Sequence, residues 1–147
     1  MATRSKEPRV RRVKSTLGVG TLSATRSAPG GDKRRLGAEA EAIATRLLLD
    51  EGYRIVERNF TADLGELDIV ARDGDVLVFC EVRSRANRDH GDAVEMVSRT
   101  KQRRVARVAA LYLEVRKPDY EEARFDVIGI TGGEASLVKD AFRLGRY

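Results

Sequence analysis

The chain has 147 residues, enough for one domain with a hydrophobic core, and its 41% hydrophobic and 35% charged residues are typical of a soluble globular protein. Its longest apolar run, residues 76–80, is too short to span a bilayer, so no membrane partner is expected. The single cysteine, Cys80, excludes an internal disulfide and is expected to be a buried thiol. The single histidine, His90, excludes a metal site built on paired histidines. Any chemistry must therefore use carboxylates, lysines or arginines, with or without a metal ion.

The net charge of +5 belongs to the first part of the chain. Residues 1–35 contain 10 Lys and Arg against two acidic residues, whereas residues 36–147 contain 18 against 21. The first 35 residues also lack aromatic residues and apolar periodicity, so we expect a disordered basic extension, followed by a folded domain over residues 36–147. Such an extension is an arm that binds nucleic acid through phosphate attraction, a solubilising tail, the product of a start codon assigned too far upstream, or an organellar transit peptide.

From residue 36 the sequence has the periodicity of regular elements. Apolar residues at helical spacing predict a helix that Gly52 ends. Its buried face consists of Ala40, Ile43, Ala44, Leu47 and Leu48. A strand is predicted over residues 53–60. Two β-rich runs within residues 65–83 flank Asp73-Gly74, which is a strong signal for a hairpin with a tight turn.

The rest of the chain predicts a second helix and two further strands. The helix spans residues 98–116 and is capped by Ser98. Its inward-facing residues are Val105, Val108, Ala109 and Tyr112. Strands are predicted over residues 124–131 and 136–139, and Asp126 is expected to be a buried partner for an arginine. The predicted fold is therefore α/β, with a mixed β-sheet flanked by two main helices.

The predicted hairpin brings acidic side chains to one face. If Asp73-Gly74 forms the two-residue loop, Glu66 lies opposite Glu81, and Asp68 is a diagonal neighbour of Glu81. Because strand side chains alternate, these three carboxylates share a face with Arg83. Converging like charges destabilise a hairpin unless a cation neutralises them, and oxygen ligands favour Mg²⁺ or Mn²⁺ over zinc.

Arg83 supplies a fixed positive charge beside these carboxylates, suited to a phosphate oxygen. The alternative is a solvated charged face on which Arg83 pairs with Glu66 or Asp68. Periodicity alone does not decide between the two interpretations.

The start of the second predicted helix is strongly basic. It is either a phosphate-tracking face beside the acidic residues or a solvated helix surface. Lys101 is in addition a candidate to face the acidic site itself. The candidate nucleic-acid-binding residues are Arg83, Arg85, Arg99, Lys101, Arg103, Arg104 and Arg107.

Three segments carry a family resemblance. They are Gly65-Glu66-Leu67-Asp68-Ile69-Val70, Phe79-Cys80-Glu81-Val82-Arg83-Ser84-Arg85 and Arg124-Phe125-Asp126-Val127. These segments resemble the bacterial YraN-like family, which is placed with archaeal Holliday-junction resolvases and restriction endonucleases in the PD-(D/E)XK superfamily. The resemblance runs from Gly37 to Phe142 and includes Glu41, Gly52-Tyr53, Asn59 and Lys101 at matching spacing. It implies a restriction-endonuclease-like core.

The resemblance implies metal-assisted hydrolysis of phosphodiester bonds in structured, branched DNA. Asp68, Glu81 and the backbone carbonyl of Val82 would hold Mg²⁺ or Mn²⁺, and Glu41 or Glu66 would orient the attacking water or a second ion. The superfamily usually has lysine where this chain has Arg83. Arginine stabilises phosphate charge but is a poor proton-transfer partner, so the departure puts turnover in question more than substrate binding. Lys101 would then replace the missing lysine in part.

Three functions follow from the sequence. The first is a metal-dependent endonuclease acting on structured DNA in the cytoplasm, with a homodimer expected by analogy with junction-cutting enzymes. The second is a non-catalytic nucleic-acid-binding module of the same fold, and the third is a partner-binding protein. Metal titration separates the first from the third, and nucleic-acid binding without cleavage would select the second.

Overall fold

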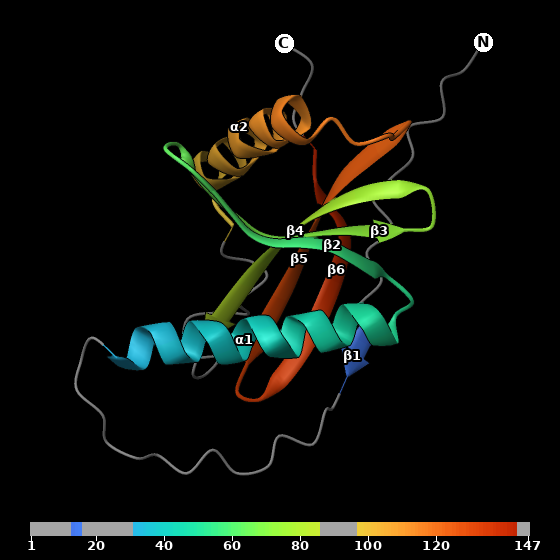
Figure 1. Cartoon of the computed structure of the whole chain (residues 1–147). Coiled ribbons are helices and arrows are strands. Elements are labelled where there is room, and N and C mark those ends of the chain that lie inside the picture. Colours follow the sequence, from blue (N-terminus) through green and yellow to red (C-terminus); the bar gives the residue numbers. More distant parts are fainter. Residues whose placement is uncertain (1–12, 16–30, 86–96, 144–147) are drawn as a thin grey trace.

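The computed structural model describes residues 13–15, 31–85 and 97–143 (Figure 1). In chain order its elements are β1 (Val13–Ser15), α1 (Gly31–Asp50), β2 (Arg54–Ala62), β3 (Gly65–Asp73), β4 (Val76–Arg85), α2 (Arg99–Arg116), β5 (Glu122–Thr131) and β6 (Glu134–Phe142). The strands form one sheet in the order β1-β6-β5-β4-β3-β2. Strands β4 and β5 are parallel and the other neighbours are antiparallel. The predicted α/β class with a mixed sheet and two main helices is confirmed, and it is consistent with a restriction-endonuclease-like core.

Helix α1 has the predicted buried face but begins earlier than expected. Ala40, Ala44, Leu47 and Leu48 are buried, and Ile43 packs beside them. The helix ends before Gly52, which has a φ of +86° that favours glycine. Its start at Gly31 lies five residues before the expected domain boundary, and Val13–Ser15, which also precedes that boundary, pairs with β6.

Helix α2 matches its prediction closely. Ser98 is the N-cap, and its Oγ accepts a hydrogen bond from the backbone N–H of Lys101 at 3.2 Å. The four predicted inward residues, Val105, Val108, Ala109 and Tyr112, are all buried. The helix ends at Arg116, and Lys117 adopts a left-handed conformation before Pro118. Neither α1 nor α2 is long and apolar enough to cross a membrane.

The two helices cover opposite faces of the sheet, as Figure 1 shows. Strand β4 is buried on both sides: Val78 and Cys80 belong to the core under α1, and Leu77 and Phe79 to the core under α2. The Cys80 thiol is buried as expected, and burial holds its pKa well above the usual range. Because successive side chains of a strand point to opposite faces, Glu81 is the next residue of β4 after Leu77 and Phe79 whose side chain points toward α2.

The turn of the β3–β4 hairpin differs from the prediction. Asp73 pairs with Val76, so the loop consists of Gly74 and Asp75 rather than of Asp73 and Gly74. Gly74 has a φ of +59° and Asp75 is not left-handed, which is the pattern of a turn with glycine at its first loop position. The register of β3 against β4 therefore differs from the predicted register by two residues. Because side chains alternate with a period of two, the residues of the ladder from Asp73–Val76 to Ile69–Cys80 keep their predicted faces while their opposite partners change.

Asp126 is the buried partner of an arginine, as predicted. Its carboxylate accepts hydrogen bonds from Arg124 Nε at 2.9 Å, Tyr53 Oη at 2.7 Å and the backbone N–H of Asp140 at 2.9 Å. Arg124 also donates to Asp73 at the end of β3, at 2.6 Å. This network ties β5 and β6 to the start of β2 and to the hairpin, and its central residue, Asp126, pairs with Cys80, the residue before Glu81.

Candidate active site

The candidate site lies where strands β3 and β4 stop pairing. Their ladder begins at the hairpin turn and ends at Ile69 and Cys80. Leu67 packs in the α2 core and Ile69 in the α1 core, although residues two apart in a regular strand share a face. The alternation of β3 is therefore interrupted at Asp68.

Strand β2 is irregular at the matching position. Its register with β3 places Asn59 opposite Asp68, between the pairs Arg58–Ile69 and Phe60–Leu67. Asn59 has a φ of +57°, in the left-handed region that asparagine tolerates better than most residues. The paired irregularity brings side chains from both faces of the sheet toward one place.

Asp68 closes the open end of the β3–β4 ladder. Its Oδ2 accepts a hydrogen bond from the backbone N–H of Val82 at 2.8 Å. If the observed register is continued by one residue, Asp68 lies directly opposite Glu81. The predicted pairing of Glu66 with Glu81 is therefore wrong. The neighbouring carboxylates are those of Asp68 and Glu81. The predicted role of the Val82 carbonyl as a metal ligand stays a prediction.

Glu81 is a buried carboxylate with a counter-charge from a different element. Its side chain is 5% exposed, and Lys101 of α2 places Nζ 3.1 Å from Glu81 Oε1. Burial and the adjacent Asp68 raise the pKa of Glu81 to about 7, and Lys101 opposes this shift. Lys101 therefore faces the acidic site and not solvent alone.

Arg83 reaches the same site without forming a hydrogen bond through Nε. This nitrogen lies 3.9 Å from Glu81 Oε1, which is too long for a hydrogen bond. It is buried, and no described residue accepts its proton. Because a buried N–H without an acceptor is unfavourable, Arg83 Nε is ready to donate to a ligand oxygen.

Glu41 approaches Asp68 from α1. Its Oε1 accepts a hydrogen bond from Asn59 Nδ2 at 2.8 Å, so the left-handed residue of β2 also anchors the helical acid. Burial raises the pKa of Glu41, and the charges of Asp68 and Glu66 add to the effect, against the hydrogen bond from Asn59. Glu66 itself is exposed.

The predicted residues are thus brought together only in part. Asp68, Glu81, Arg83 and Lys101 meet at the end of the ladder, and Glu41 flanks them. The expected convergence of three carboxylates is not found: within residues 13–15, 31–85 and 97–143, no three acidic, histidine or cysteine side chains form a group that could hold a metal ion. The chain offers instead a pair of adjacent carboxylates.

The donor set of this pair nonetheless fits a divalent cation. Mg²⁺ is commonly held by one or two carboxylates, with water and substrate phosphate completing its shell. One oxygen of Asp68 accepts from the Val82 N–H and one of Glu81 contacts Lys101, so a cation would bind the other two oxygens and replace the contact between the two carboxylates. Burial and, after it, the neighbouring Asp68 raise the pKa of Glu81, so a cation bound to the pair would favour the ionised carboxylate.

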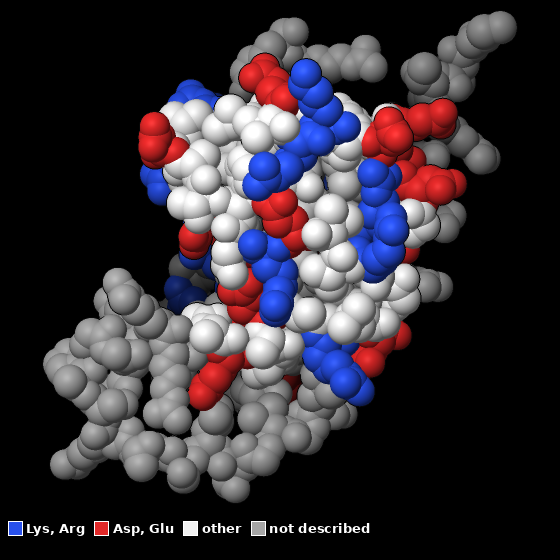
Figure 2. Space-filling view, in the orientation of Figure 1, with Lys and Arg blue, Asp and Glu red and all other residues white. Residues whose placement is uncertain are grey.

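The basic residues of α2 lie beside this pair. Arg99, Arg103, Arg104 and Arg107 are exposed, as a nucleic-acid-binding face requires. Arg85 is partly buried near the end of β4. Figure 2 shows acidic and basic side chains interspersed over the face seen in Figure 1, so the charge of the described part is not collected into one broad surface there.

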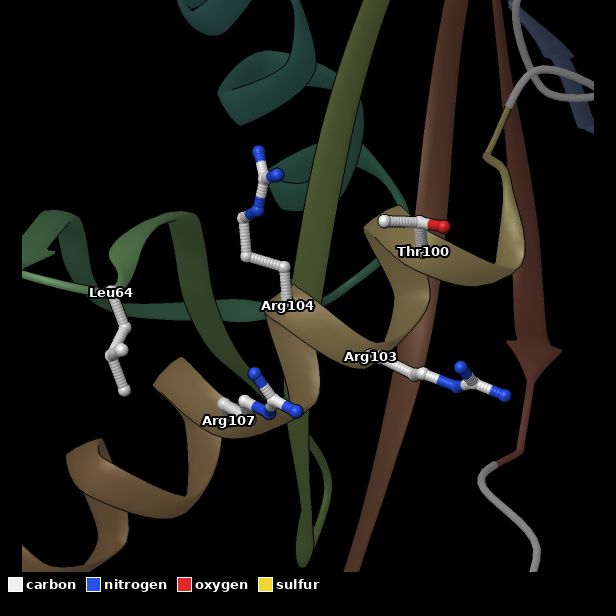
Figure 3. A pocket seen from close by; sticks show the side chains of 5 residues that line it. All are labelled: Leu64, Thr100, Arg103, Arg104 and Arg107. Carbon is white, nitrogen blue, oxygen red and sulfur yellow. The ribbon is translucent and has the colours of Figure 1, made fainter.

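A hollow of about 260 Å³ lies between α2 and the β2–β3 turn (Figure 3). It is lined by Leu64, Thr100, Arg103, Arg104 and Arg107. Sequence reasoning found the arginines but missed Leu64 and the structural role of Asn59. The signal that could have identified Leu64 is an apolar residue directly before Gly65, at a turn between two predicted strands. The loop with His90 lies outside the described residues.

These features define an α/β protein with an acidic pair at the open end of a central strand ladder and a basic helix beside it. The model of "Uncharacterised protein family UPF0102" matches residues 40–130. A UPF0102 protein of Dictyoglomus thermophilum is 38% identical over 109 residues, covering 74% of this chain and 92% of that protein. One from Syntrophus aciditrophicus is 40% identical over 114 residues, covering 75% and 90%.

A third relative, a UPF0102 protein of Chlorobaculum tepidum, is 47% identical over 95 residues, which cover 65% of this chain and 74% of that protein. The chain belongs to the UPF0102 family, in agreement with the YraN-like resemblance in its sequence. The matched residues include the whole of the β2–β4 region that builds the acidic pair.

Proposed function

We propose that this protein is a metal-dependent endonuclease of the PD-(D/E)XK superfamily that hydrolyses phosphodiester bonds in structured, branched DNA. The observation that carries the proposal is the pair of Asp68 and the buried Glu81 at the end of the β3–β4 ladder, with Lys101 and Arg83 beside it. Carboxylates next to cationic groups are what a site for a metal ion and a phosphate needs.

Asp68 and Glu81 would hold Mg²⁺ or Mn²⁺, which supplies polarisation of a phosphoryl oxygen and a bound water of lowered pKa. Arg83 Nε, which is buried and has no acceptor in the described part of the chain, would donate to a phosphate oxygen and stabilise charge as it develops there. Lys101, whose Nζ lies 3.1 Å from Glu81 Oε1, would donate a proton to the departing oxygen. Glu41, anchored by Asn59, would orient the attacking water.

A cytoplasmic location and pairing of two copies accord with this substrate, since two sites are needed to cut both strands at a branch. These two statements rest on the resemblance and on analogy between folds.

The second candidate is a binding module of the same fold that does not cut. The observation in its favour is Arg83, which cannot exchange a proton near neutral pH and stands where the superfamily usually has lysine. In this case the acidic pair and α2 would position a nucleic acid without hydrolysing it.

The test is cleavage of a labelled panel of four-way junction, flap, single strand and duplex with Mg²⁺ or Mn²⁺. We expect metal-dependent cutting by the wild type and a loss of about 100-fold or more for Asp68→Asn and for Glu81→Gln. Asp75→Asn is the matched control, because Asp75 is an exposed acid in the loop of the same hairpin and has no role assigned in the site. Binding without cutting, equal in all four proteins, would select the binding module.

A further inference from the structure

The hollow beside α2 has the charge of an anion site that nothing in the described structure neutralises. Among the residues described, no carboxylate pairs with Arg103, Arg104 or Arg107, whereas other surface arginines have acidic partners. Arg103 and Arg107 are also four residues apart on one helix, a spacing at which like charges repel. An anion bound between these arginines would therefore relieve their repulsion.

Leu64 makes this hollow different from a plain phosphate site. It is 54% exposed, on the turn between β2 and β3, and it lines the hollow with the arginines. Figure 3 shows Leu64 beside the turns of α2 that carry Arg104 and Arg107, while Arg103 extends away from it. An exposed leucine next to guanidinium groups offers an apolar surface and a planar cation in one place, which suits the face of a nucleobase.

The hollow is connected to the acidic pair. The stem of Arg104 lies over Gly65, since a Cβ at that glycine would stand 3.5 Å from Arg104 Cδ. Gly65 begins β3, and Asp68 lies three residues further, about 10 Å along an extended strand. On the other side, Lys101 is one turn of α2 before Arg104. A strand held at the hollow would thus run toward Asp68 and Glu81.

We infer that this hollow binds an unpaired nucleotide of a DNA strand, with Arg104 and Arg107 on its phosphates and Leu64 against its base. The inference deepens the proposed function, because it assigns the substrate feature that the site recognises. In a continuous duplex the base faces are stacked on one another, so Leu64 can contact one only where a strand is unpaired. At about 260 Å³, the hollow is smaller than the roughly 300–1,000 Å³ of pockets for drug-sized ligands, so it has room for the base of one nucleotide while the phosphates lie at its rim.

The test measures binding by fluorescence anisotropy in EDTA, so that cleavage plays no part. The probes are a labelled single-stranded oligonucleotide and the duplex that contains the same strand, each with the full chain. Leu64→Ser is compared with Leu49→Ser, because Leu49 is an exposed leucine of similar exposure, 51%, on α1. Arg107→Gln is compared with Arg46→Gln, because Arg46 is an exposed arginine of α1 that pairs with Asp50.

We expect Leu64→Ser to weaken single-strand binding about fivefold and duplex binding less than about twofold, from the loss of one apolar contact. Arg107→Gln should weaken binding to both probes and lower the slope of log K against log salt by about 0.7 on the single strand. The inference is overturned if Leu64→Ser behaves as Leu49→Ser does, or weakens both probes equally. That result would leave a cleavage activity lost in Asp68→Asn untouched, so the two proposals fail separately.

Discussion

Glu81 holds the main electrostatic conflict among the residues of the site. Its carboxylate is buried beside Asp68, which favours the protonated form, and beside Lys101, which favours the ionised form. The raised pKa shows that burial and Asp68 outweigh Lys101 in the free protein. An ionised Glu81 therefore costs stability unless a cation is bound, which is the arrangement expected of a functional rather than a structural acid.

This conflict predicts the pH dependence of stability. The pKa of Glu81 rises from a usual value of 4.5 to about 7 on folding, so the folded state holds the proton more tightly and wild-type stability falls as pH rises through this window. We expect Glu81→Gln to match the wild type near pH 4 and to exceed its free energy of unfolding by on the order of 2 kcal/mol above pH 7. Urea unfolding in EDTA at a series of pH values measures this difference.

Glu66→Gln provides the control, because Glu66 is exposed and should show no such pH-dependent gain. If Glu81→Gln is less stable than the wild type at pH 8, the ion pair with Lys101 outweighs the burial of Glu81. The predicted upward shift of the Glu81 pKa would then be wrong.

Among the elements, β2 and β3 share an interruption that positions the site. Asn59 in its left-handed conformation stands opposite Asp68, and the side chains on either side of Asp68 enter different cores. A regular pair of strands would keep Glu41 and Glu81 on separate faces of the sheet. The interruption lets Asp68 lie between α1 and α2, so the site depends on a backbone irregularity.

Substitutions at Asn59 test this. Asn59→Ala should be about 1 kcal/mol less stable than Asn59→Gly, because alanine is strained at a φ of +57° and glycine is not. Both variants lose the hydrogen bond to Glu41, so their difference isolates the backbone term. Chemical denaturation gives the two free energies of unfolding, and equal values would mean that Asn59 leaves the left-handed region without loss.

In the whole molecule, one sheet separates two cores. Leu47 and Leu48 of α1 pack on one face, and Val108 and Tyr112 of α2 on the other. Because the central strands contribute buried side chains to both cores, neither helix can lose its packing without exposing the same strands. The two faces should therefore unfold together.

Leu47→Ala tests this cooperativity. Leu47 is fully buried under α1, and its truncation should lower the free energy of unfolding by about 2–5 kcal/mol. Circular dichroism should show a single unfolding transition. The free energy of opening measured by hydrogen exchange of α2 amides should fall by the same amount as the free energy of unfolding, although α2 lies on the far face. Protection of α2 that survives the loss of α1 would show two independent units.

The sequence by itself determined the elements and the faces of this protein. Periods of 3.6 and 2 in apolar residues fixed α2 with its cap at Ser98, and the buried face of α1. They also placed Asp68, Glu81 and Arg83 on one face, because these patterns depend on neighbours in the chain. Asp126 was likewise recognisable as a buried acid because it stands between apolar residues of a strand next to an arginine.

Only the tertiary structure decided how these residues meet. Asp73-Gly74-Asp75 is compatible with two loops, and only the pairing of Asp73 with Val76 shows that Glu81 faces Asp68 rather than Glu66. The contact of Lys101 with Glu81 and the place of Leu64 beside the arginines join segments far apart in the chain. Such contacts depend on how α2 packs across the sheet, and this packing cannot be inferred from the local sequence pattern.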